Sequence, residues 1–188
     1  GTSNEWATSV FEITAGLTKV EPKSGVVGTV VTVEGVNYQT GETVYINFGT
    51  HNTITTTIAT TGTFSTTFTV DTQPAGTTSI VGIGVFSGVT CNSSFVIISD
   101  ITLISPASGP VGTEVTVWGR GYDQSGTLTI SFGTNPTITT VNTNVNGTFS
   151  LTFIIDTQIV GTKIITVTGM FIDTTAFVIV PKIITLIP

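Results

Sequence analysis

The chain contains two copies of one sequence. Residues 22–50 align with residues 106–134 at a constant offset of 84 residues, and both segments carry the pattern P-x-S-G-x-V-G-T-x-V-T-V-x-G. An internal period of this length indicates tandem structural units. The 188 residues are therefore predicted to fold as two domains of one kind, residues 16–98 and residues 99–180.

Each copy consists of short apolar–polar alternations separated by Gly, Asn, Asp and Pro, which is typical of an all-β sandwich. Threonine is the commonest residue, with 42 of 188, and β-branched side chains favour strands. No segment shows a helical period, so essentially no helix is expected. In the first copy the predicted strands are residues 17–21, 30–33, 43–48, 53–58, 63–70, 79–86 and 93–98. The predicted fold class is all-β: two tandem immunoglobulin-like β-sandwiches with an extra strand segment at each end.

The extra segments follow from a closing motif that occurs three times. Phe11, Phe95 and Phe177 each precede a proline by 11 residues. Residues 1–15 therefore look like an orphan last strand, and residues 181–188 like an orphan first strand.

Two explanations of the orphan strands remain open. The chain is part of a longer array, or the orphan strands pair with neighbouring copies of the chain. Exposed strand edges invite such pairing, and a head-to-tail contact of this kind propagates into a homopolymer. The predicted subunit-interface residues are Val10, Phe11, Ile13, Ile183, Ile184, Leu186 and Ile187.

Composition excludes several classes of function. Five basic residues stand against eleven acidic ones, so a nucleic-acid partner is not expected. No run of 18 apolar residues occurs, and no membrane insertion of this chain is expected. Cys91 is alone, so no disulfide within the chain can form, and we expect it to be a small buried hydrophobe. The scarcity of charge, 9%, suits an extracellular or cell-surface protein.

The repeated motif ending at Gly35 and Gly119 resembles the IPT/TIG group of immunoglobulin-like domains. The later F-G-T and G-T-F-S elements fit the same group. The resemblance implies spacer or adhesion modules of surface proteins, filaments and receptors. The Thr-rich, Lys-poor composition is more similar to that of archaeal or bacterial envelope proteins than to that of animal receptors. Such a fold hosts many functions and does not name one.

Catalytic residues are not evident. His51 is the only histidine, and its counterpart in the second copy is Asn135, so no repeated acid–base pair exists. No serine stands in a G-x-S-x-G elbow. We expect no enzyme activity and no cofactor. Asp71 and Asp156 recur before a turn and are predicted to bond turn backbone; a calcium site including Asp100 at the junction is the alternative.

Trp118 takes the place of Glu34 in the second copy and alternates with valines that face the core, so it is predicted to point outward. Packing between the domains and stacking on a sugar are both open uses for it. Asn92 and Asn146 begin N-x-[ST] sequons and are glycosylation candidates. The leading functional hypothesis is a structural subunit of an extracellular filament or surface layer. The alternative is an adhesion or carbohydrate-binding module that recognises glycans.

Overall fold

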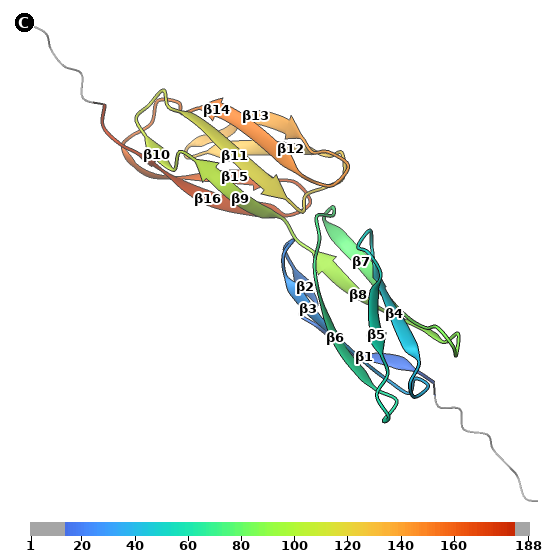
Figure 1. Ribbon diagram of the computed structural model, residues 1–188. Coiled ribbons are helices and arrows are strands. Elements are labelled where there is room, and N and C mark those ends of the chain that lie inside the picture. The colour runs from blue at the N-terminus through green and yellow to red at the C-terminus, as the bar shows by residue number, and fades with distance from the viewer. Residues whose placement is uncertain (1–13, 183–188) are drawn as a thin grey trace, which may run out of the picture.

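The computed structural model describes residues 14–182, which form sixteen β-strands and contain no helix. The all-β fold class is confirmed. The strands form four sheets, which pair into two sandwiches, and Figure 1 shows these lying end to end. Within the described residues there is accordingly no helix able to cross a membrane.

The first sandwich, domain 1, has a three-stranded sheet in the order β1-β3-β6 and a five-stranded sheet in the order β2-β8-β7-β4-β5. Its strands are β1 (Gly16–Glu21), β2 (Ser24–Gly25), β3 (Val30–Val36), β4 (Thr43–Phe48), β5 (Ile54–Thr57), β6 (Phe64–Thr69), β7 (Gly76–Gly84) and β8 (Thr90–Ile97). The two-residue strand β2 pairs parallel to β8, and every other pairing is antiparallel.

The second sandwich, domain 2, repeats this topology with sheets β14-β11-β9 and β10-β16-β15-β12-β13. Its strands are β9 (Asp100–Ser105), β10 (Ser108–Gly109), β11 (Glu114–Arg120), β12 (Thr127–Phe132), β13 (Asn135–Asn142), β14 (Phe149–Ile154), β15 (Gly161–Thr168) and β16 (Ile172–Ile179). The two-fold division expected from the repeat therefore corresponds to two sheet pairs of the same strand order.

Strand alternation builds a separate hydrophobic core in each sandwich. In β3 and β11 every second residue is buried, as the period of two requires. Aromatic rings fill both cores at equivalent places: Tyr38 stacks edge-on to Phe64, with ring centroids 5.4 Å apart, and Tyr122 stacks edge-on to Phe149 at 5.1 Å. Each core thus depends on its own side chains, and neither contains a disulfide within the described residues.

The predicted strands of the first copy differ from the structure chiefly at four strands. Strand β3 extends to Val36 instead of ending at residue 33, and β8 begins at Thr90 instead of residue 93. Strand β2 was not predicted, because two residues carry no alternation. Strand β7 begins and ends earlier than the predicted 79–86, since Val85 and Phe86 belong to the hairpin turn before β8. Of the predicted orphan segments, 1–15 and 181–188, residues 1–13 and 183–188 lie outside the described residues.

A short junction joins the two sandwiches. Strand β8 ends at Ile97 and β9 begins at Asp100, so only Ile98 and Ser99 lie between them. The loop between β6 and β7 reaches across, where the backbone N–H of Ala75 donates a hydrogen bond of 2.8 Å to the carbonyl of Tyr122. This contact fixes which ends of the two domains meet.

Candidate binding groove on domain 2

The outer face of the three-stranded sheet differs most between the two domains. Residue Glu34 of β3 and its counterpart Trp118 of β11 occupy the same outward position, each flanked by buried neighbours. The structure confirms that Trp118 points away from the core. Its surroundings can therefore be compared directly with those of Glu34.

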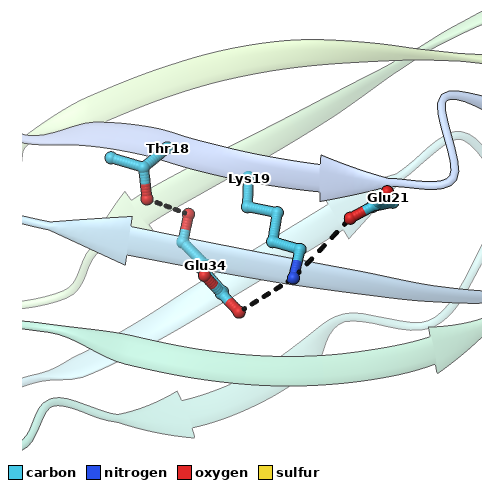
Figure 2. Close-up of polar contacts among 4 residues, drawn as sticks. All are labelled: Thr18, Lys19, Glu21 and Glu34. Carbon is cyan, nitrogen blue, oxygen red and sulfur yellow. Dashed lines mark hydrogen bonds and ion pairs between the residues drawn. The ribbon is translucent and has the colours of Figure 1, made fainter.

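In domain 1 this position belongs to an ion-paired cluster, which Figure 2 shows. Lys19 lies opposite Glu34 in the β1–β3 register, and its Nζ is 3.5 Å from Glu34 Oε1 and 3.6 Å from Glu21 Oε2. Thr18 donates a hydrogen bond of 3.3 Å to the Glu34 carbonyl. The side chains are substantially exposed, so the pairs contribute little to stability but keep this face hydrated.

In domain 2 the same register carries an apolar pair. Leu103 lies opposite Trp118 and is 55% exposed, although it takes the place of Lys19. The backbone arrangement is retained, since Thr102 donates a hydrogen bond of 3.2 Å to the Trp118 carbonyl. The sheet has therefore kept its geometry while an ion pair became an exposed leucine beside a partly exposed indole.

Trp118 borders an open groove of about 480 Å³. Its lining comes mainly from β9, β11, β13 and β14 and is largely neutral and polar: Thr72, Thr102, Trp118, Gly119, Arg120, Asn142, Asn144, Thr148, Phe149 and Ser150. An equivalent groove of about 420 Å³ exists in domain 1, lined by Thr18, Glu34, Gly35, Val36, Thr56, Thr57, Ala59, Thr63, Phe64 and Ser65. The groove belongs to the fold, but its lining differs between the copies.

Four substitutions change the character of the groove. Relative to domain 1, domain 2 has Trp118 for a glutamate, Arg120 for a valine, Asn142 for a threonine and Asn144 for an alanine. The side chain of Asn144 is used to build the adjacent turn, where its Oδ1 accepts the N–H groups of Asn146 and Thr148 at 3.0 Å each. Asn142 accepts the hydroxyl of Thr127 at 2.8 Å, and no described residue bonds its amide nitrogen.

The only charged side chain of this groove is neutralised locally. Arg120 Nη2 lies 3.4 Å from Asp100 Oδ2, a cross-strand pair between β11 and β9. Behind the pair, burial raises the pKa of the Tyr122 hydroxyl, and the carboxylates of Asp173 and Asp100 raise it further, so this group stays protonated. The groove therefore presents an aromatic ring among hydroxyl and amide groups, without a free charge.

The repeated aspartates accept hydrogen bonds from side-chain amides and not from the turn backbone, so the predicted backbone partner is wrong. Asp71 accepts a hydrogen bond from the side-chain amide of Gln73, whose own Oε1 accepts the backbone N–H of Thr50 at 3.0 Å. In domain 2, Gln158 Nε2 donates to Asp156 Oδ1 at 2.9 Å and to the carbonyl of Phe132 at 3.0 Å. The Asp-Thr-Gln sequence thus links two loops of each sandwich through the glutamine.

The calcium alternative finds no assembled ligand set. Asp100 pairs with Arg120, while Asp173 accepts the backbone N–H of Ile101 at 2.5 Å and Asp123 accepts that of Met170 at 3.0 Å. Among residues 14–182 no group of three His, Cys, Asp or Glu side chains is placed to hold a metal ion. These carboxylates serve backbone donors and an ion pair.

The remaining candidates are dispersed. Asn92 is exposed on β8, and Asn146 is exposed in the turn between β13 and β14; their glycosylation stays a prediction. His51 is partly buried and packs edge-on to Phe68, with ring centroids 5.7 Å apart, so it is less solvated than a loop position suggests. Cys91 is only half-buried, with its Sγ 2.5 Å from the Tyr38 hydroxyl, so the expected burial of this residue is incomplete.

All seven predicted subunit-interface residues lie outside the described residues: Val10, Phe11, Ile13, Ile183, Ile184, Leu186 and Ile187. Sequence inspection missed Leu103. Its substitution for Lys19 at the repeat offset was visible in the alignment, but only the β9–β11 register shows that it faces Trp118. The repeat alignment therefore contained the substitution, and the strand pairing shows that the new side chain lies opposite Trp118.

Fold and groove together define a tandem immunoglobulin-like protein with one diverged surface groove. No protein-family model matches the chain, and no curated protein is similar to it in sequence. The IPT/TIG resemblance therefore stays a hypothesis.

Several solved structures resemble the chain at low identity and with TM-scores below 0.5. Yersinia pseudotuberculosis adhesin InvE is 15% identical, with 88% of this chain and 58% of that chain covered and a TM-score of 0.44. Invasin, a bacterial integrin-binding protein, is 17% identical, with coverages of 89% and 39% and a TM-score of 0.42. The C-terminal fragment of intimin, solved with the intimin-binding domain of its translocated receptor, is 14% identical, with coverages of 87% and 64% and a TM-score of 0.40. The chain thus spans less than two thirds of these three, and such TM-scores assign it neither a family nor a function.

Proposed function

We propose that the chain is a non-catalytic adhesion module of an extracellular or cell-surface protein, and that the Trp118 groove of domain 2 binds a neutral carbohydrate. The observation that carries the proposal is the replacement of the Lys19–Glu34 ion pair by Leu103 and Trp118 on an unchanged backbone. Exposed apolar side chains at a sheet surface favour a partner over water.

The chemistry of the lining matches a sugar. The face of an indole ring is apolar and carries the negative side of its quadrupole, so it packs against the C–H face of a pyranose. Hydroxyl and amide groups such as Ser150, Thr148 and Asn142 can exchange hydrogen bonds with sugar hydroxyls. Because Asp100 neutralises Arg120, an anionic ligand would gain little here.

The openness of the groove sets the expected affinity. An open surface covers one face of a ligand, and one stacked ring with few hydrogen bonds gives a dissociation constant on the order of 1 mM, about −4.1 kcal/mol. Multivalent presentation on a cell surface would raise the avidity without new contacts.

The test is a titration of the chain with neutral oligosaccharides, namely cellohexaose, xylohexaose, chitohexaose and mannohexaose, followed by amide chemical shifts. We expect at least one to shift resonances of β9, β11 and β14. The double variant Trp118→Glu with Leu103→Lys copies the cross-strand pair of domain 1, and it should weaken binding at least tenfold while preserving the fold.

A matched control is Ile172→Thr, an exposed position on β16 where domain 1 has Thr90. This variant should bind like the wild type. Binding that survives the double variant would place the ligand elsewhere on the molecule. If no oligosaccharide shifts any resonance at a concentration 20 times the expected dissociation constant of about 1 mM, carbohydrate binding is refuted.

The second candidate is the filament or surface-layer subunit assembled by strand pairing, as a homopolymer. Its strand-exchange version depends on the orphan segments, so the experiment is deletion of residues 1–13 or of residues 182–188 from a chain that polymerises. Loss of polymers after deletion supports strand exchange, and unchanged polymers reject it.

A further inference from the structure

The junction between the two domains is built from a donor loop and an acceptor turn. The donor loop is Pro74–Ala75 of domain 1, and its Ala75 N–H bonds the carbonyl of Tyr122. The acceptor turn is Tyr122 with Gly147 of domain 2, where the Tyr122 N–H donates a hydrogen bond of 2.9 Å to the Gly147 carbonyl. These groups define the contact between consecutive domains.

The acceptor turn is shaped to receive the loop. Gly147 has a φ of 69°, and a Cβ there would lie 2.9 Å from the Cα of Pro74 and 2.3 Å from the carbonyl oxygen of Tyr122. Any other residue would therefore push the donor loop away. Glycine is required both by the backbone conformation and by the neighbouring domain.

The repeat places a second acceptor turn at the far end of domain 1. The Tyr38 N–H donates a hydrogen bond of 3.1 Å to the carbonyl of Gly62, whose φ is 72°. These residues occupy the positions of Tyr122 and Gly147. Among residues 14–182 no group donates a hydrogen bond to the Tyr38 carbonyl, the counterpart of the one that Ala75 uses.

A second donor loop lies at the opposite end of domain 2. Ile159 and Val160 take the places of Pro74 and Ala75, and they are 81% and 53% exposed. No described residue accepts a hydrogen bond from the Val160 N–H. The antiparallel strands β11 and β14 span domain 2 between the junction and its far end. This loop and the acceptor turn of domain 1 therefore lie at opposite ends of the described structure (Figure 1).

The two unused surfaces are more apolar than the pair that is joined. Val36 of domain 1 stands where domain 2 has Arg120, and isoleucine and valine replace the proline and alanine of the donor loop. Large apolar side chains gain nothing from exposure at a loop tip, whereas burial against a second surface removes them from water and is favourable. The free ends therefore suit each other.

We infer that the Ile159–Val160 loop of one copy docks on the Tyr38–Gly62 turn of domain 1 of a second copy. The Val160 N–H then donates to the Tyr38 carbonyl, as Ala75 donates to Tyr122 within the chain. The contact is heterologous, so it repeats head to tail. It does not involve the Trp118 groove, and it stands or falls independently of carbohydrate binding.

The test joins two copies, because one loop on one turn gives weak association between free chains and a tether raises the effective concentration. Pro181 of the first copy is joined directly to Gly16 of the second. Val180 and Pro181 then occupy the places of Ile98 and Ser99 at the natural junction. Residues 1–15 and 182–188 are kept at the outer ends of the fusion.

The readout is amide hydrogen exchange at Val160 of the first copy. We expect exchange at least tenfold slower than in the single chain, with Ala75 as the protected reference in both. Val160→Asp in the first copy should abolish protection of its own amide and of Ile159, whereas Ile172→Thr should leave it intact. Equal exchange of Val160 in the fusion and the single chain would overturn the inference, as would protection that survives Val160→Asp.

Discussion

Glu42 provides the sharpest test of how the loops of domain 1 are held. The residue is 6% exposed, and its carboxylate lies between the loop after β3 and the hairpin between β7 and β8. It accepts the backbone N–H groups of Gln39 at 2.7 Å, Ser87 at 3.0 Å and Phe86 at 3.3 Å, together with the Ser87 hydroxyl at 3.1 Å. The perturbation is Glu42→Gln, which keeps the shape and removes the charge.

The magnitude follows from these bonds. Hydrogen bonds to a charged group contribute about 1.5–3 kcal/mol each, and a buried donor left without an acceptor costs about 1–3 kcal/mol. Glutamine retains one acceptor oxygen and turns an NH₂ group toward the donors that the other oxygen served. We therefore expect the free energy of unfolding of domain 1 to fall by about 2–3 kcal/mol at pH 7.

The effect must depend on pH. Burial raises the pKa of Glu42, but the hydrogen bonds from Ser87, Gln39 and Phe86 outweigh it and hold the pKa below its ordinary value of 4.5. Because the folded state has the lower pKa, the stabilisation is fully present above pH 4.5 and is lost as pH falls through the folded pKa. The difference between wild type and variant should therefore shrink below pH 4.5.

The assay is native-state hydrogen exchange of core amides in β4 and β7, measured at pH 7 and extended to pH 3 by thermal unfolding. Domain 2 is an internal control, because it has Gly126 at the position of Glu42 and pins its loops with the Thr143 hydroxyl instead. A loss that is the same at pH 7 and pH 3, or one that appears equally in domain 2, would refute the anchoring role.

Two further predictions concern domain 2. Gln158→Ala should lower its free energy of unfolding in urea by about 1–3 kcal/mol, because the carbonyl of Phe132 and the carboxylate of Asp156 lose their donor. An unchanged urea midpoint would contradict a stabilising role of Gln158 between the two loops. Gly119→Ala should cost about 1–3 kcal/mol by the same measurement, since a Cβ would lie 2.4 Å from Phe149 Cε1, whereas the control Gly16→Ala meets nothing within 4 Å and should change stability by less than about 0.5 kcal/mol.

The architecture could be predicted from patterns along the chain. The repeat implied two units of one kind, and alternation with period two assigned most strands and the outward direction of Trp118. These features are local, because they depend on the steric preferences of neighbouring residues along one strand or turn. They can therefore be predicted without knowing which residues pack against them.

Which residues come into contact depends on how the sheets pack. The parallel pairing of β2 with β8, the apposition of Leu103 and Trp118, and the reach of Glu42 to Ser87 all join segments far apart in the chain. Register between strands is set by the packing of whole sheets, and no short sequence pattern specifies it. The candidate groove and the exposed donor loop are consequences of that packing, which is why the alignment contained their substitutions without revealing their neighbours.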